Sequence, residues 1–190
     1  MLQDLTRVVV DELELRQLAF VDALTGAMTR RAFLAEGEKE VHRARRHGRG
    51  LSCIMFDLDH FKSINDVHGH AAGDQVLSHV IAACRGALRA SDHIGRLGGE
   101  EFAVVLPETG VEAARIAELL RATISSLDVV HGSQTIRVSA SFGVAVLSPQ
   151  DANFGSMIAR ADMALYEAKN SGRNTVVQHG SKDLQQERTA

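Results

Sequence analysis

The densest group of chemically capable residues is the segment Asp57–Asp66, which reads DLDHFKSIND. It directly follows the apolar run Leu51–Phe56, which predicts a buried central strand. Acids at the carboxyl end of such a strand lie where α/β proteins commonly build sites, and carboxylates suit Mg²⁺. The first amides of a following helix can hold phosphate. The alternative interpretation is that Asp59 or Ser63 only caps that helix.

A second group is the segment Arg96–Phe102, which reads RLGGEEF. The Gly98-Gly99 pair predicts a tight hairpin turn whose backbone a ligand can approach. The adjacent acids Glu100 and Glu101 repel each other unless a cation screens them, although a solvated acidic turn is the alternative. Together with the strand-end Asp57, the hairpin favours a carboxylate metal site. Two metals held there would activate a hydroxyl and stabilise the leaving oxygens of a phosphoryl group.

Three basic or mixed segments have simpler interpretations. Lys169 and Arg173 end the last predicted helix, where cations are favourable against the helix dipole. Arg89 and Asp92 could be a helix-ending arginine and a capping acid. The arginines between residues 43 and 49 indicate a solvated helix face, since acidic residues precede them. The nine histidines show no zinc-type spacing with the two cysteines.

The composition predicts a soluble globular protein: 190 residues, 45% hydrophobic, 24% charged, with a net charge of −3. No apolar run is long enough to cross a bilayer, the first residues do not resemble a secretion signal, and we expect no membrane insertion. Cys53 and Cys84 lie in apolar stretches, which predicts reduced core thiols and a cytoplasmic location. The absence of Trp and the negative charge argue against nucleic acid, and weakly against any polyanionic partner.

The elements that must position these residues follow from apolar periodicity. Helices are predicted over residues 3–20 and about 29–47, in a short segment after the strand at 51–56, and over about 76–88, 113–127 and 157–171, the last ending at Gly172. A β-hairpin is predicted over roughly residues 128–147 with its turn near Gly132, and a short strand near Thr175–Gln178. This alternation indicates an α/β sandwich with a mixed sheet. We expect a connector helix at 1–21, one domain at 22–178 and a disordered polar tail at 179–190.

The segment Gly98–Phe102 resembles the signature of the GGDEF domains, the diguanylate cyclases, in its GGEEF form. The segment Asp22–Gly26, followed by Arg30 and Arg31, is similar to the motif that opens the family. Thr29 and Ala27 depart from the Asn and Leu that are usual there, in a loop with a mainly structural role. The resemblance extends from Asp22 to about Gln178 and implies a mostly antiparallel central sheet flanked by helices, as in the palm of nucleotidyl cyclases and polymerases.

The resemblance also implies roles for individual residues. Asp57, Glu100 and the Leu58 carbonyl would hold Mg²⁺ or Mn²⁺, two ions per loaded site, and Glu100 would help to deprotonate the attacking 3′-hydroxyl. Lys62 would act in catalysis by neutralising phosphate charge. The remaining residues implied to bind GTP are Phe61, Asn65, His70, Asp74, Lys169 and Arg173. Of these, Asn65 and Asp74 would read the guanine edge, which His70 would border, whereas Lys169 and Arg173 would bind the triphosphate.

The activity implied is the condensation of two GTP into cyclic di-GMP and two pyrophosphates, by two domains that meet in a two-fold symmetric homodimer. Arg89 and Asp92 have the register of the inhibitory RxxD site of the family, which binds the product; Arg115 or Arg121 could supply a further arginine. The segment Leu5–Arg16 resembles the closing helix of a GAF sensor domain, so that an N-terminal sensor is a possible partner. Two alternatives remain: a non-catalytic module that binds GTP or cyclic di-GMP, and a related cyclase that accepts ATP.

Overall fold

The centre of the fold is strand β2 (Leu51–Leu58), all of whose residues are buried. It pairs antiparallel with β4 (Glu101–Pro107) on one side and β7 (Ala140–Val146) on the other. Alternate residues of β2 face opposite layers of the core, as a pleated strand requires. The strand predicted at residues 51–56 is therefore confirmed, and it extends by two residues so that Asp57 lies within the sheet.

The main sheet has six strands in the order β1-β3-β4-β2-β7-β8. Its outer members are β1 (Met28–Thr29), β3 (His93–Gly98) and β8 (Val176–Gln178). The β1–β3 and β7–β8 pairs are parallel, whereas the three inner pairs are antiparallel. The predicted mixed, mostly antiparallel sheet is confirmed.

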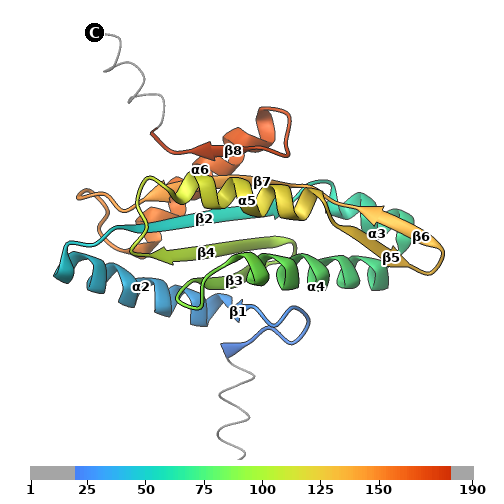
Figure 1. Cartoon of the computed structure of the whole chain (residues 1–190), viewed down its shortest axis with the longest axis horizontal. Coiled ribbons are helices and arrows are strands. Elements are labelled where there is room, and N and C mark those ends of the chain that lie inside the picture. Colours follow the sequence, from blue (N-terminus) through green and yellow to red (C-terminus); the bar gives the residue numbers. More distant parts are fainter. Residues whose placement is uncertain (1–19, 181–190) are drawn as a thin grey trace, which may run out of the picture.

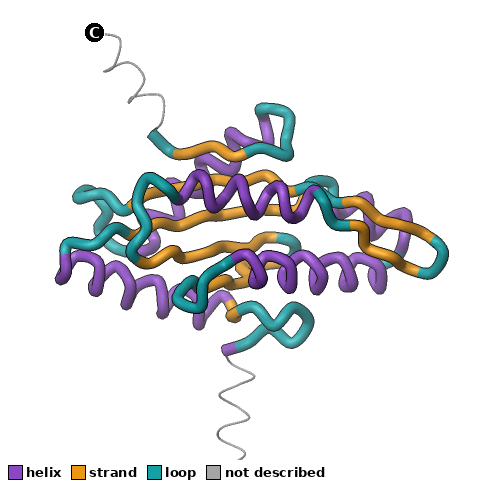
Figure 2. The backbone as a smooth tube through the Cα atoms, in the orientation of Figure 1, coloured by secondary structure: helices purple, strands orange, loops and turns teal. Residues whose placement is uncertain are grey.

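Helices cover both faces of this sheet (Figures 1 and 2). One core layer lies between the sheet and two helices, α4 (His70–Ala87) and α5 (Ala113–Ser125). The opposite layer is formed with α2 (Arg30–His47) and α6 (Phe154–Asn170). The short helix α3 (Phe61–His68) follows β2 directly.

Close packing of α6 on β7 depends on Gly143, because a Cβ there would collide with the backbone of Ala161 and Leu165. This contact brings the end of α6 close to the end of β2 that carries Asp57. Because α6 packs tightly on the sheet, its last turn places Lys169 next to Asp57.

The prediction of one hairpin over residues 128–147 was wrong. The turn at Gly132 is present, with φ of 61°, but it joins only β5 (Asp128–His131) to β6 (Gln134–Arg137). These two strands form a separate sheet that extends from one end of the molecule (Figure 2). Their few buried residues contrast with the almost wholly buried β7, which enters the main sheet because its apolar side chains can be covered on both faces.

The computed structural model describes residues 20–180. The expected connector helix, apart from its last residues, and the expected tail from residue 181 lie outside this part of the chain. Cys53 and Cys84 are buried free thiols, as expected, and burial raises the pKa of each to about 12. Within residues 20–180, no helix combines the length and the apolar character needed to span a bilayer.

Candidate active site

Two neighbouring strands bring the predicted acids together at one end of the sheet. Asp57 of β2 lies opposite Glu101 of β4 in the ladder, and the Leu58 amide donates to the Glu100 carbonyl over 3.4 Å. The ladder is rigid at this point, because the rings of Phe102, Phe56 and Phe142 stack across three strands with centroids 5.4 and 5.1 Å apart. The Gly-Gly hairpin, which joins β3 to β4, therefore holds Glu100 beside the end of β2.

A cavity of about 220 Å³ lies at this end of β2. The Lys169 amine, from the last turn of α6, lies 2.9 Å from Oδ2 of Asp57. Lys169 lies in the last turn of α6, as the helix-dipole interpretation requires, and the contact with Asp57 adds a second partner for its charge. Predicted site residues that line the cavity are Asp57, Leu58, Phe61, Lys62, Glu100, Lys169 and Arg173.

The surroundings of Asp57 disfavour the ionised form of its carboxyl group. Burial raises the pKa of its carboxyl, and the charges of Glu100 and Glu101 raise it further, whereas the hydrogen bond and charge of Lys169 lower it without cancelling the rise. A half-buried group of acids that cannot all ionise freely favours a cation at the same place. The arrangement therefore has the donor chemistry of a divalent metal site, with carboxylate and carbonyl oxygens of the kind that Mg²⁺ prefers.

Asp59, which sequence reasoning treated as a possible helix cap, has a different role. Residue 60 rather than Asp59 precedes α3, and no side chain caps the helix. The buried Asp59 carboxylate instead accepts from the hydroxyls of Ser139 and Ser141, each at 2.7 Å, and from the Asn174 amide at 3.0 Å. It thereby ties the end of β2 to β7 and to the loop that carries Arg173.

That loop has an unusual backbone. Gly172, Arg173 and Asn174 all have positive φ, at 107°, 64° and 43°. This left-handed conformation is energetically unfavourable for residues other than glycine, so contacts with the rest of the protein must stabilise it at Arg173 and Asn174. Two hydrogen bonds hold Asn174. Its backbone N–H donates to the Asp59 carboxylate, and its side-chain oxygen accepts from Arg121 at 2.7 Å.

The predicted guanine-binding residues lie outside the lining of this cavity. Asn65 is half-buried on α3, whereas His70 and Asp74 are exposed in the first two turns of α4. The Asn65 side chain packs on α4, because its Oδ1 occupies the space where a Cβ on Gly73 would lie. Asn65 thus lies against the turn of α4 that carries Asp74.

The predicted product site is on a different side of the domain. Arg89 lines two adjacent cavities, of about 390 and 500 Å³, and Asp92 lines the second. Oδ2 of Asp92 accepts from the Arg89 amide at 2.8 Å, but its Oδ1 is buried with no hydrogen-bond partner among residues 20–180. Arg43 and Arg49 border the first cavity, and their side chains are exposed, as the interpretation of a solvated face requires.

The two arginines suggested for this site have other surroundings. Arg121 binds Glu118 and Asn174, and neither it nor Arg115 lines the cavities beside Arg89 within the described chain.

An ion pair that sequence reasoning missed connects the opening motif to the hairpin. Arg96 binds the Asp22 carboxylate at 3.2 Å and donates from Nε to the Gly99 carbonyl at 2.9 Å. Asp22 also accepts from the Thr25 amide and hydroxyl at 2.9 and 2.6 Å. Burial raises the pKa of Asp22, but the hydrogen bonds of Thr25 and the nearby Arg96 outweigh it and lower the pKa overall. The motif residues Asp22 and Thr25 were visible in the sequence, but their partner was not.

Comparison with known proteins adds independent information. The family model described as "Diguanylate cyclase, GGDEF domain" matches residues 19–175. The chain is 42% identical over 160 residues to the diguanylate cyclase DgcP of Pseudomonas aeruginosa, covering 84% of this chain and 24% of that protein. It is 39% identical over 164 residues to the response regulator PleD of Caulobacter vibrioides, covering 85% of this chain and 36% of that protein. The chain thus spans well under half the length of these curated relatives.

Solved structures resemble this fold closely. The coiled coil and GGDEF domain of DgcB from Caulobacter crescentus, in complex with c-di-GMP, has a TM-score of 0.87 at 30% identity, covering 93% of this chain and 94% of that one. The active GGEEF domain of a diguanylate cyclase from Vibrio cholerae has a TM-score of 0.76 at 36% identity, covering 80% and 96%. At these identities, the likeness extends beyond the general fold.

Proposed function

Because the chain belongs to the GGDEF domain family of diguanylate cyclases, we propose that it condenses two GTP into cyclic di-GMP and two pyrophosphates. The observation that supports this most directly is the convergence of Asp57, Glu100 and Lys169 around one cavity at the end of β2. Acids for a metal and cations for phosphates, side by side, are what phosphoryl transfer requires. The region at 22–178 would be the catalytic domain.

The metal would be held by the carboxylates of Asp57 and Glu100 and by the Leu58 carbonyl. This donor set fits Mg²⁺ or Mn²⁺, and we propose two ions per site once GTP is bound. Bound there, the ions would lower the pKa of the attacking hydroxyl and neutralise charge on the phosphates. Lys169 balances Asp57 in the chain as described, and it would be released toward the triphosphate when a metal takes its place.

The remaining residues would bind and orient the nucleotide. Glu100 would accept the proton of the 3′-hydroxyl, while Lys62 and Arg173 would neutralise the phosphates beside Phe61. Asn65 and Asp74 would read the guanine edge, since a carboxylate accepts from the guanine N–H donors and an amide both donates and accepts. His70 would border that subsite. The attack is in line on the α-phosphorus, so that each new P–O bond releases one pyrophosphate.

We propose that the active unit is a homodimer. One domain holds one GTP, and each 3′-hydroxyl must reach the α-phosphorus on the other nucleotide, which two-fold symmetry provides. A helix at 1–21 could align two such domains, and a sensor domain on its N-terminal side would control that alignment. A cyclase whose output of cyclic di-GMP is controlled by a sensor would act in second-messenger signalling.

We also propose that cyclic di-GMP inhibits the enzyme at Arg89 and Asp92. The unpartnered Oδ1 of Asp92 supports this, since a guanine N–H could satisfy it once the carboxylate turns into the cavity that Asp92 lines. Arg43 and Arg49 could add planar forks for phosphate or guanine. Arg89→Ala should relieve product inhibition and leave initial turnover unchanged, whereas the exposed Arg115→Ala should leave the inhibition curve as it is. An unchanged curve in Arg89→Ala would count against the site.

The central test is to incubate the chain with GTP and Mg²⁺, identify the product by mass and measure pyrophosphate across a range of protein concentrations. We expect cyclic di-GMP and a specific activity that rises with protein concentration. Glu100→Ala should abolish turnover with an unchanged circular dichroism spectrum. Glu112→Ala, which removes an exposed acid before α5, is the matched control and should be fully active.

Two outcomes would favour the alternatives. No product from a verified dimer would indicate a binding module, which the presence of Asp57, Lys62, Glu100 and Glu101 argues against. Substantial mixed product from equal ATP and GTP would indicate a cyclase with broader specificity, which Asp74 argues against.

A further inference from the structure

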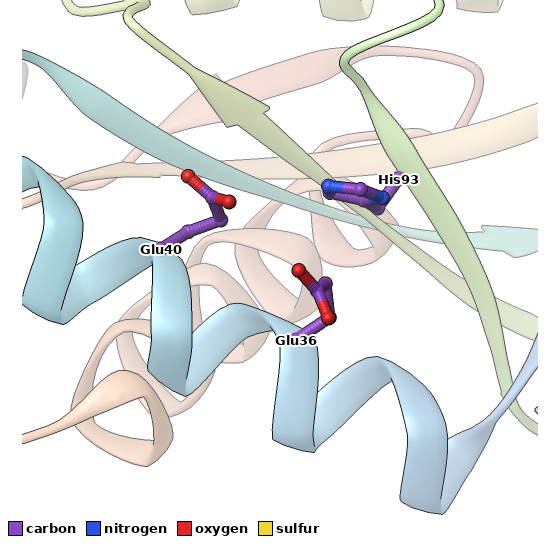
Figure 3. Close-up of side chains that lie close together, drawn as sticks. All are labelled: Glu36, Glu40 and His93. Carbon is purple, nitrogen blue, oxygen red and sulfur yellow. The ribbon is translucent and has the colours of Figure 1, made fainter.

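A second group of metal-ligand side chains lies outside the active site, between α2 and β3. Glu36 and Glu40 are one helical turn apart on α2, and His93 begins β3. Figure 3 shows their carboxylates and imidazole turned toward one shared space. Ligand atoms from the three residues all lie within 4.8 Å of one another. We propose that Glu36, Glu40 and His93 form a binding site for a divalent transition metal ion of the Zn²⁺ type.

The backbone that presents these ligands is rigid. Residues at i and i+4 share one face of a helix, so both glutamates point to the same side of α2. That side packs tightly on β3, where a Cβ on Gly95 would collide with the Phe33 ring of α2. Two packed elements therefore hold the three donors in place, which spares an ion the entropic cost of collecting them from flexible loops.

Burial and charge at the cluster also favour a cation. The Glu40 side chain is only 3% exposed and carries a carboxylate, which is costly to bury without positive charge beside it. Arg43 pairs with Oε1 of Glu40, and Lys39 binds Oε2 of Glu36 at 2.7 Å. Each of these pairs uses one oxygen of its glutamate, and a carboxylate has a second oxygen that can bind an ion. The cavity of about 390 Å³ that the three ligands border can supply water for the rest of the coordination shell.

The donor set selects the class of metal. One imidazole and two carboxylates suit Zn²⁺ and its first-row neighbours, whereas Mg²⁺ and Ca²⁺ prefer oxygen donors alone. Three protein ligands with an open position are also common where Zn²⁺ keeps a bound water. The cluster thus differs from the active-site cavity, whose proposed metal donors are all oxygens. No residue belongs to both groups, so this inference stands or falls independently of turnover, although the cluster borders the same cavity as Arg89 of the proposed product site.

The test is a titration of the full chain with Zn²⁺ against a chromogenic chelator, in millimolar Mg²⁺ so that oxygen-donor sites are occupied. We expect one Zn²⁺ per chain at this site. His93→Asn and Glu36→Gln should each weaken its affinity by about 100-fold or more, because even outer-shell partners of a metal change affinity by about 10- to 100-fold. Zn²⁺ should also raise the Tm of the unaltered chain but not of either variant.

His42→Asn is the matched control. His42 lies on the same helix and forms only an exposed pair with Glu38 at 3.6 Å, so its loss should leave Zn²⁺ affinity unchanged. Retention of the original affinity in either test variant, or an equal loss in His42→Asn, would overturn the proposal. Glu36 is half-buried on the helix surface, so Glu36→Gln keeps the test valid should His93→Asn fail to fold.

Discussion

Replacement of Asp59 tests whether one buried carboxylate organises the phosphate side of the site. Asp59 accepts hydrogen bonds from Ser139, Ser141 and the Asn174 amide. Asp59→Ala removes all of these bonds and leaves the donors unsatisfied. Asp59→Asn keeps the shape: its amide oxygen can face Ser139 and Asn174, and its amide nitrogen can donate to Ser141 once that hydroxyl rotates.

The magnitudes follow from these contacts. Hydrogen bonds to a charged group contribute about 1.5–3 kcal/mol each, but three bonds to one carboxylate are not additive. We therefore expect Asp59→Ala to lower the free energy of unfolding by about 3–4 kcal/mol. Asp59→Asn loses only the charge assistance, or about 1–2 kcal/mol. At about 2–4 °C per kcal/mol for a chain of this size, the alanine variant should lose at least about 6 °C in Tm.

Two assays check this reasoning. Urea unfolding gives the stabilities, and steady-state kinetics gives KM for GTP, which should rise in Asp59→Ala because the Asn174 amide no longer fixes the loop of Arg173. If Asp59 acts through that loop, adding Asp59→Ala to Arg173→Ala should raise KM little further. Equal stabilities for the alanine and asparagine variants, or additive KM effects in the double variant, would refute the role assigned to Asp59.

Three other perturbations test the surroundings of the site. Burial and acidic neighbours raise the pKa of Asp57, so its contribution to stability is present below the ordinary aspartate pKa and is lost as pH rises through the raised value. Asp57→Asn should therefore raise the Tm of the metal-free chain at neutral pH while abolishing turnover, and a lower Tm would contradict this. The pKa of Asp22 is lowered, so its stabilisation is present at neutral pH and is lost as pH falls through the lowered value. Asp22→Asn should lower the Tm at pH 7, with a difference that narrows in acid; a constant difference in a pH series of thermal melts would argue against the ion pair with Arg96. Gly73→Ala should displace Asn65 and raise KM for GTP, whereas Gly86→Ala, on the same helix with open space around it, should not; equal kinetics would remove Asn65 from the nucleotide site.

Local pattern predicted most of the helices and strands, and it singled out the acids Asp57 and Glu100. The apolar run before Asp57 predicts β2, and the Gly-Gly pair predicts the hairpin that carries Glu100. Both depend on neighbours in sequence, so periodicity and turn chemistry identify them. The hairpin predicted over residues 128–147 failed because the chain forms three strands there, and the sequence does not show that β7 pairs with β2 while β5 pairs with β6.

The contacts that organise the site were beyond local pattern. Asp59 meets Ser139 and Ser141 because β7 pairs with β2 in one particular register, which a single sequence does not reveal. The solvated interpretation of Arg43 is confirmed, since its side chain is exposed, but the sequence did not show that this side chain borders the same cavity as Arg89. In each case the decisive neighbour is far along the chain.

The net charge of −3 illustrates the same separation between composition and site. It argued weakly against polyanionic partners, yet a nucleotide triphosphate is polyanionic, and the proposed site is suited to it. The charge that matters is local: Asp57 is so placed that its ionised form needs a cation, and Lys169 already supplies one. A metal bound to these acids would replace their repulsion of phosphate with attraction, and it would free Lys169 to bind phosphate as well. A mildly acidic chain can therefore present a cationic pocket, because part of its negative charge serves to hold positive ions.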